Sequence, residues 1–263
     1  TVLYEFGLQQ QLTSVMAFEM SAFYKDIRDL LALQSIRYDS EKYGPSNYAI
    51  YMNKDYGNVK GFTFSLTKRY DRVTKTSAFV DYTYQVTEGN SVKSGSFYYN
   101  ALSGEEEEKR IVPLSWDQRH ILNSTVSVGD PGNWNLGLIS KLSSGWPYTP
   151  NIPDANYIPL SNSGRKPWQW RIDMRLHKNF KVGKFQYIVY TKIYNLLDRR
   201  NERYVFNDTG RAGYTYVSQS TQETKGFVDH YGESGVHTWS EYQVRPQYYT
   251  APRSINIGFS LDF

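Results

Sequence analysis

The chain has 263 residues, no cysteine, and 30 lysines and arginines against 26 aspartates and glutamates. A net charge of +4, spread along the chain, is too small to indicate nucleic-acid binding, and the lack of cysteine excludes a disulfide-stabilised scaffold. Apolar runs reach only about four residues, whereas a membrane-spanning helix needs about 20.

Apolar and polar residues alternate in nine segments, which is the period of a β-strand with one apolar and one polar face. No segment of useful length has the 3.6-residue period of a helix. The sequence therefore predicts an all-β protein. The nine predicted strands are 4–12, 16–25, 61–70, 77–85, 122–128, 134–143, 168–177, 185–194 and 252–263.

The connections between these strands alternate in length. The short ones are 13–14, 71–72, 130–133 and 181–184, and the long ones are 27–56, 87–117, 147–166 and 197–251. Soluble sandwiches and propellers have no reason to sort connections in this way. Short periplasmic turns and long extracellular loops are typical of outer-membrane β-barrels.

The last segment has the two faces that such a barrel needs. Its large side chains are Ile255, Ile257, Phe259, Leu261 and Phe263, and between them lie Ser254, Asn256, Gly258, Ser260 and Asp262. A face that simply met water would carry lysine and glutamate, whereas small polar side chains suit a crowded, wet interior. An apolar outside and a polar inside predict an antiparallel transmembrane β-barrel strand.

The strand count predicts an incomplete barrel. The last strand follows a long connection, so it runs from the extracellular side to the periplasm, and counting back the first strand runs the same way. A bacterial barrel has an even number of strands and both ends in the periplasm, so nine strands cannot close one. The chain also opens at Thr1 directly in a strand-like pattern. We expect it to be the C-terminal part of a larger barrel.

Aromatic residues, 16% of the chain, cluster at strand ends. Tyr70, Trp134, Phe180, Phe185 and Phe263 lie beside short turns, and Tyr4, Tyr24, Trp146, Tyr148, Trp168 and Tyr194 lie beside long connections. Tyrosine and tryptophan also favour strands in general. Their clustering nevertheless predicts two belts, one at each membrane interface.

Several pieces of the chain resemble the C-terminal barrel of TonB-dependent outer-membrane receptors, in particular the large receptors with a carboxypeptidase-regulatory-like N-terminal domain. The pieces are 4–8, 22–29, 53–61, 116–120, 144–150, 194–198 and the last strand, in family order over nearly the whole chain. One position departs from the pattern: the family has an acidic residue where this chain has Thr63.

The resemblance implies a barrel of 22 strands, of which residues 1–263 would be roughly the last nine. It also implies an N-terminal plug domain and contact with TonB, neither of which these residues include. The expected function is energy-dependent import of a scarce, bulky nutrient such as a siderophore, vitamin, peptide or oligosaccharide. The expected surroundings are the bilayer and lipopolysaccharide of a Gram-negative outer membrane.

Three other functions stay open from the sequence. A passive channel or porin would conduct ions without an energy source. An outer-membrane barrel enzyme would depend on a histidine such as His177 or His230. A soluble all-β binding module, for example a lectin, would fold in water without detergent.

The candidate lumenal site is a set of charged side chains on one predicted face. It comprises Lys141, Arg171, Asp173, Arg175, His177 and Lys192. Such a wall could meet the plug domain or guide an anionic substrate, but lumenal charges also commonly pair with one another. We favour mutual pairing or plug contact over direct substrate binding.

The candidate extracellular site is the aromatic-rich last connection. Its ligand candidates are Tyr204, Tyr214, Tyr216, Tyr231, Trp239 and Tyr242. Exposed aromatic side chains on long loops bind sugars or flat molecules by stacking. They could equally form a small core of the loop itself.

The remaining motifs predict no catalytic residue, metal or cofactor. The acidic run 105–108 is interpreted as a solvated loop tip, with a cation bridge to lipopolysaccharide as the alternative. His120, His177, His230 and His237 lack the i, i+4 spacing of a helical zinc site, and no Gly-x-Ser-x-Gly motif occurs. We therefore expect no enzymatic activity.

Overall fold

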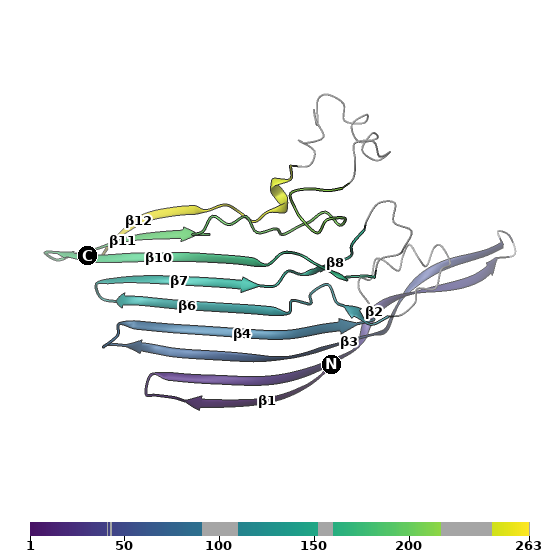
Figure 1. The fold of residues 1–263 in the computed structure, drawn as a ribbon, viewed down its shortest axis with the longest axis horizontal. Coiled ribbons are helices and arrows are strands. Elements are labelled where there is room, and N and C mark those ends of the chain that lie inside the picture. Colours follow the sequence, from purple (N-terminus) through teal and green to yellow (C-terminus); the bar gives the residue numbers. More distant parts are fainter. Residues whose placement is uncertain (41, 43, 91–109, 152–159, 217–243, 263) are drawn as a thin grey trace, which may run out of the picture.

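The computed structural model describes residues 1–262 except 41, 43, 91–109, 152–159 and 217–243. Its main feature is one antiparallel sheet in which neighbouring long strands follow one another in the chain (Figure 1). Within the described residues the nine long strands are β1 (Val2–Gln11), β2 (Met16–Ser40), β3 (Gly44–Asp71), β4 (Thr76–Gly89), β6 (His120–Asp130), β7 (Trp134–Ser143), β10 (Gln169–Val182), β11 (Phe185–Tyr194) and β12 (Ser254–Asp262). The predicted number and order of strands are confirmed.

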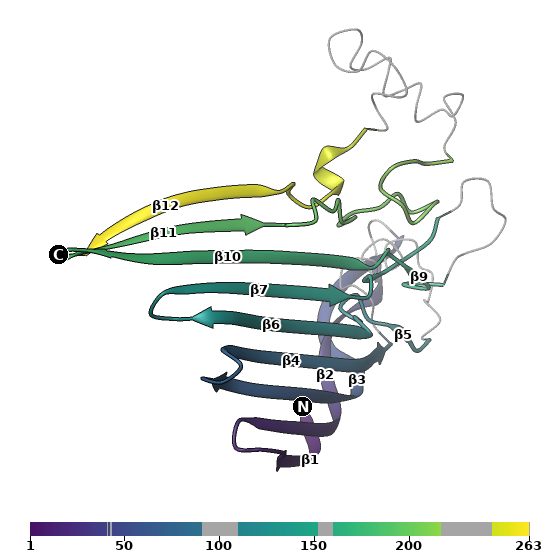
Figure 2. The ribbon, with the colours of Figure 1, turned by 60° about the vertical axis from the view of Figure 1, so that its left-hand side comes forward.

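The sheet is a curved wall that does not close on itself (Figures 1 and 2). β1 and β12 lie at its two edges, and within the described part of the chain neither has a partner on its outer side. The described residues contain no helix with the length and apolar content to cross a membrane. The all-β architecture is therefore an open part of a barrel, as the strand count predicts.

Within the described residues, four small elements lie at the end of the sheet where the long connections are. β5 (Val112–Pro113) pairs with the end of β4, β8 (Pro147–Tyr148) pairs with β9 (Gly164–Arg165), and η2 (Pro246–Tyr248) is a short 3-10 helix. Figures 1 and 2 show them grouped at that end. We call the described residues 110–119, 144–151, 160–168, 195–216 and 244–253 the rim.

The strand register gives the sheet one apolar and one polar face. One row of directly opposed residues is Leu8, Met20, Phe64, Tyr82, Leu122, Leu142 and Trp170. The next row, one residue along each strand, is Gln9, Glu19, Ser65, Asp81, Asn123, Lys141 and Arg171. Because successive side chains point to opposite faces, the first row defines the apolar face and the second the polar face.

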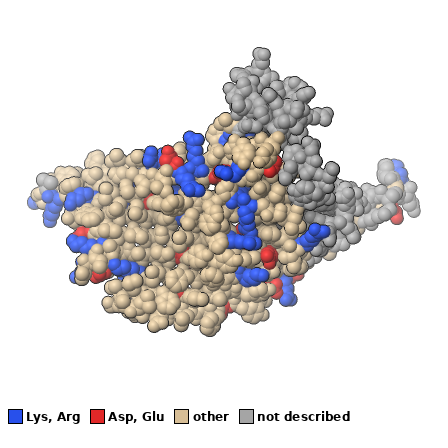
Figure 3. Space-filling view, in the orientation of Figure 1, with Lys and Arg blue, Asp and Glu red and all other residues tan. Residues whose placement is uncertain are grey.

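Charged and aromatic side chains lie mainly toward the ends of the strands. On the side visible in Figure 3, mostly uncharged surface separates the charged groups near the short turns from those near the rim. Aromatic residues of the apolar face near the two ends are Tyr4, Tyr24, Trp134, Phe180 and Phe185. Of the other predicted belt residues, Tyr194 is on the polar face, with the Arg171 guanidinium 5.8 Å from its ring centre. Tyr148 packs within the rim, and Trp146 and Trp168 are exposed rim residues. Phe263 lies outside the described residues.

The prediction that residues 27–56 form a long irregular connection is wrong. β2 and β3 run through it as one long hairpin that projects beyond the sheet (Figure 1). The pairing shifts register between Ile27 and Leu31, and Asp29 adopts a positive φ of 62° there. Such a bulge moves every later side chain to the opposite face, so the alternation breaks although the strand continues.

The bounds of the long strands leave the predicted long connections after β4, β7 and β11 between them, and the short turns lie at the opposite end of the sheet (Figure 1). Asp71 organises the turn between β3 and β4. Its carboxylate accepts hydrogen bonds from the backbone N–H groups of Val73 (3.1 Å) and Thr74 (3.2 Å) and from the Thr74 hydroxyl (2.9 Å). The bond from Val73, followed by those from Thr74, lowers the pKa of Asp71 below its ordinary value.

This turn predicts a pH-dependent contribution to stability. A carboxylate with a lowered pKa stabilises the fold above its ordinary pKa of 3.8, and the contribution is lost as the pH falls through the lowered value. The Asp71→Asn variant should therefore be less stable than wild type at pH 6, and the difference should shrink as the pH falls through the lowered pKa of Asp71 and its carboxylate becomes protonated, as measured by urea unfolding in lipid vesicles. A stability difference that does not change with pH would contradict this.

Candidate functional site

The polar face brings the predicted lumenal residues together across three neighbouring strands, β7, β10 and β11. Arg171 lies directly opposite Lys141 of β7, and Arg175 lies opposite Lys192 of β11. His177 follows two residues later on the same face of β10, opposite Tyr190 of β11. All six predicted residues therefore share one face.

Most of these charges do not pair with one another. The Arg171 Nε donates to Asp173 Oδ1 at 2.8 Å, and the same oxygen accepts the backbone N–H of Asn195 at 2.8 Å. In the part of the chain that the structure describes, Lys141, Arg175, His177 and Lys192 form no ion pair with a carboxylate. The Lys192 ammonium instead lies 5.3 Å from the ring centre of Tyr190. The result is a wall with an excess of positive charge.

Apolar side chains interrupt this polar face. Phe79 and Ile139 lie on either side of Thr125 in one register row, which continues to Asp173. Phe79 is 43% exposed and Ile139 is 56% exposed. Large apolar side chains left open on a polar surface favour a covering partner.

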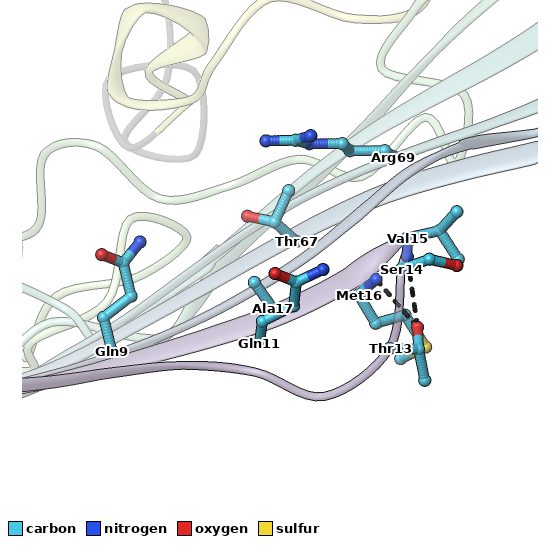
Figure 4. A pocket seen from close by; sticks show the side chains of 9 residues that line it. All are labelled: Gln9, Gln11, Thr13, Ser14, Val15, Met16, Ala17, Thr67 and Arg69. Atoms are coloured by element: carbon cyan, nitrogen blue, oxygen red, sulfur yellow. Dashed lines mark hydrogen bonds between the residues drawn. The ribbon is translucent and has the colours of Figure 1, made fainter.

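A polar hollow lies at the short-turn end of the polar face (Figure 4). It has a volume of about 420 Å³ and is lined by Gln9, Gln11, Thr13, Ser14, Val15, Met16, Ala17, Thr67 and Arg69. The Thr13 hydroxyl accepts the backbone N–H groups of Val15 and Met16 and so shapes the turn. The hollow presents amide and guanidinium donors, but the sequence alone does not indicate it.

Asp117 ties the base of the rim together. Its side chain is completely buried, accepts the backbone N–H of Thr87 at 2.8 Å and forms a close ion pair with the Arg165 guanidinium. The Arg119 Nε lies 3.5 Å from the same carboxylate. Asp117 therefore joins β4, β9 and the approach to β6.

Leu114 anchors the same segment by packing. Its side chain is fully buried, and its methyl groups lie 3.0 Å from where a Cβ would stand on Gly57 or on Gly89. Glycines at these two positions let the rim segment lie directly against the paired ends of β3 and β4. We call Thr87, Leu114, Asp117 and Arg165 the rim hub.

The described loop after β11 is also held by internal bonds. Glu202 forms an ion pair with the Arg211 guanidinium at 2.8 Å and accepts the backbone N–H of Ala212 at 2.6 Å. The hydrogen bond to Glu202 raises the pKa of Arg211 above its ordinary value. Burial, followed by the negative charge of Asp208, raises the pKa of Tyr148. These contacts hold residues 202–212 in a defined shape.

The predicted aromatic ligand residues have different surroundings. Tyr204 packs against Tyr248, with ring centres 6.0 Å apart, as part of a small cluster of rings in the loop. Tyr214 and Tyr216 form an edge-to-face pair at 5.9 Å and are 45% and 69% exposed. Tyr231, Trp239 and Tyr242 lie outside the described residues. Tyr204 thus belongs to a small core of the loop, whereas ligand binding by Tyr214 and Tyr216 stays a prediction.

The described residues contain no group of three or more histidine, aspartate or glutamate side chains that could hold a metal ion. His120 lies on the apolar face, where its Nδ1 is 2.9 Å from the Tyr82 hydroxyl and its ring stacks on Trp168. His230, His237 and the acidic run 105–108 lie outside the described residues. Thr63, where the family pattern has an acidic residue, exchanges a hydrogen bond of 2.7 Å with Ser21.

Comparison with known proteins supports the fold. No protein-family model matches the chain, and no curated protein matches it. The outer membrane transporter YddB from Escherichia coli superposes with a TM-score of 0.57 at 14% identity, over 78% of this chain and 29% of its own. The ferric-catecholate import receptor Fiu from Escherichia coli gives a TM-score of 0.49 at 13% identity, over 80% of this chain and 25% of its own.

The chain thus spans less than a third of either transporter. The likeness to YddB confirms the fold, that of one part of an outer-membrane transporter barrel. Sequence reasoning missed the rim hub and the fixed shape of residues 202–212. Asp117 of the hub lies in the segment 116–120, which carries part of the family resemblance. That resemblance did not indicate that Asp117 is buried.

Proposed function

We propose that residues 1–263 form the C-terminal part of the barrel of a TonB-dependent receptor in the bacterial outer membrane, and that this receptor imports a scarce, bulky nutrient. The plug domain and the segment that contacts TonB would be supplied by other parts of the protein. In this proposal the polar face lines the lumen, the apolar face meets lipid, and the rim lies outside the cell.

The observation that carries the proposal is the pair of register rows. One row places seven apolar side chains side by side across seven strands, and the next places seven polar ones on the opposite face. A soluble sheet buries its apolar face in a core, but within the described residues nothing packs on this face. Lipid is the surrounding that satisfies an apolar outer face of this extent.

Two further observations support a receptor with an occupied lumen. Phe79 and Ile139 are exposed on the polar face and would be covered by a plug domain. Lys141, Arg175 and Lys192, which form no ion pair with any described carboxylate, would meet acidic groups of the plug or of the cargo. In an empty, water-filled pore the side chains of Phe79 and Ile139 would stay exposed to water.

The proposal is tested on the protein purified from outer membranes. Its intact mass should be about three times the 30.6 kDa of this chain, since the chain covers 29% of YddB. In planar bilayers a plugged receptor should give little steady conductance, and it should bind the purified periplasmic domain of TonB. A large, stable conductance without TonB binding would instead identify a passive channel.

A further inference from the structure

A pocket of about 390 Å³ lies in the rim, between the loop that follows β11 and the segment that leads into β12. Its lining comes from three stretches of chain and comprises Arg200, Ala212, Gly213, Val244, Arg245, Pro246, Tyr249, Thr250 and Pro252. Two guanidinium groups thus share the pocket with an apolar wall of valine, prolines and a tyrosine. None of these residues belongs to the lumenal set on the polar face.

The walls of the pocket are fixed by hydrogen bonds between its stretches. The Thr250 N–H donates to the Asn201 carbonyl at 2.9 Å, and the Arg203 N–H donates to the Tyr248 carbonyl at 2.7 Å. Glu202 holds the third stretch through the backbone N–H of Ala212. A ligand would therefore meet a preformed site and would not have to order it, which favours affinity.

Among the described residues around the pocket, positive charges outnumber negative ones. Residues 195–216 and 244–253 contain six arginines and three acidic residues. Of the three acids, Glu202 pairs with Arg211, Asp208 accepts bonds from Thr215 and Tyr216, and Asp198 accepts the backbone N–H of Arg253. Figure 3 shows Lys and Arg side chains gathered toward the rim end of the visible side.

Arg200 and Arg245 have different roles in the pocket. Arg200 is exposed, and in the described part of the chain no hydrogen bond or ion pair engages its side chain. The Arg245 guanidinium lies beside the packed rings of Phe206 and Tyr248, 5.2 Å and 5.3 Å from their centres, and donates to the Tyr248 hydroxyl. Arg245 is thus held in place, and Arg200 offers a guanidinium fork without a partner.

We propose that this pocket binds a carboxylate or phosphate group carried on a small apolar body, with Arg200 as the main anion contact. A guanidinium binds such anions through two parallel hydrogen bonds, and the apolar wall takes up the remainder of the ligand. The site is defined by its own contacts. Its interpretation as a cargo site rests on the proposed transport function.

The test uses the full-length protein in detergent and two probes of nearly the same shape, benzoate and benzamide. Benzoate should bind, and benzamide should bind at least about tenfold more weakly because it lacks the charge. Arg200→Gln should weaken benzoate binding by about tenfold or more, and Arg200→Lys by less, since lysine keeps the charge but loses the fork. Arg72→Gln, at the exposed turn between β3 and β4, is the charge-matched control and should leave binding unchanged.

Each result decides the proposal. Equal binding of benzoate and benzamide, unchanged benzoate binding in Arg200→Gln, or no binding of benzoate or phenyl phosphate at about 10 mM would overturn it. Binding of phenyl phosphate that purified lipopolysaccharide displaces would support the anion site and assign it to a lipid phosphate, not to cargo. The conductance and TonB measurements do not depend on these probes, so failure of the site and failure of the transport function are distinguishable.

Discussion

Replacing Asp117 by alanine is expected to destabilise the rim by about 3 kcal/mol, the lower end of the range for breaking a buried ion pair. The substitution removes the carboxylate and leaves the Arg165 guanidinium and the Thr87 N–H without their acceptor. The Arg165 side chain keeps 29% exposure, so water compensates part of the loss. The long strands should stay paired because Asp117 joins rim segments.

Limited proteolysis measures this effect directly. Trypsin cleaves after Arg119 and Arg165, and opening of the rim by about 3 kcal/mol should raise cleavage there by about 100-fold. The matched control is Asp26→Ala, which breaks the exposed Arg28–Asp26 pair, whose side chains are 73% and 22% exposed. An exposed pair contributes about 1 kcal/mol or less, so cleavage at the rim should hardly change in the control.

Similar cleavage rates in the two variants would show that the rim hub carries no more energy than a surface ion pair. An Asp117→Ala protein that fails to assemble would place the hub in folding of the whole barrel. Asp117→Asn then separates charge from shape, because the amide oxygen can still accept the Thr87 N–H but no longer pairs with Arg165 as an ion. We expect the asparagine variant to assemble and to show an intermediate rate.

Replacing Leu138 by lysine should cost about 2–4 kcal/mol of unfolding free energy in lipid, whereas Ile139→Lys should cost about 1 kcal/mol or less. The two residues are adjacent in β7, so they lie at nearly the same depth. Leu138 opposes Val126 and Met174 on the apolar face, and Ile139 opposes Thr125 and Asp173 on the polar face. The pair therefore differs mainly in which face meets lipid.

Urea unfolding of the full-length protein in lipid vesicles gives both free energies. The gap between the variants should close when the same proteins are unfolded from a detergent with a short, mobile apolar layer, since the penalty depends on hydrocarbon around the lysine. Equal costs for Leu138→Lys and Ile139→Lys in lipid would contradict the assignment of the apolar face to the bilayer. A larger cost for Ile139→Lys would mean that the faces are reversed.

Alternation along the chain was enough to predict the nine strands, their order and the two faces. A strand repeats every two residues, so each segment shows its own faces without reference to any partner. The six lumenal candidates, such as Arg171 and Lys192, follow from that same parity and do lie on one face. How they would act on a plug or a cargo stays a prediction.

The two-residue period of a strand also explains where the sequence-based predictions were wrong. At Asp29 a bulge interrupts the alternation of apolar and polar residues, although β2 and β3 continue beyond it. The continuing parts of β2 and β3 were therefore predicted as a loop. It also could not show that Lys141 would face Arg171 and not a carboxylate, because register across strands is a property of pairing. Within the described residues, the expected mutual pairing of lumenal charges holds for Arg171 and Asp173 alone.

Only the tertiary structure decided the rim. Asp117 and Arg165 are 48 residues apart in the chain, and Arg200 and Arg245 meet at one pocket from the two sides of the last long connection. No local period relates such residues, since their approach depends on how connections pack against the strand ends and on which buried polar groups need partners. The sequence by itself thus determined the strands and the wall they form, whereas long-range packing determined the sites at its mouth.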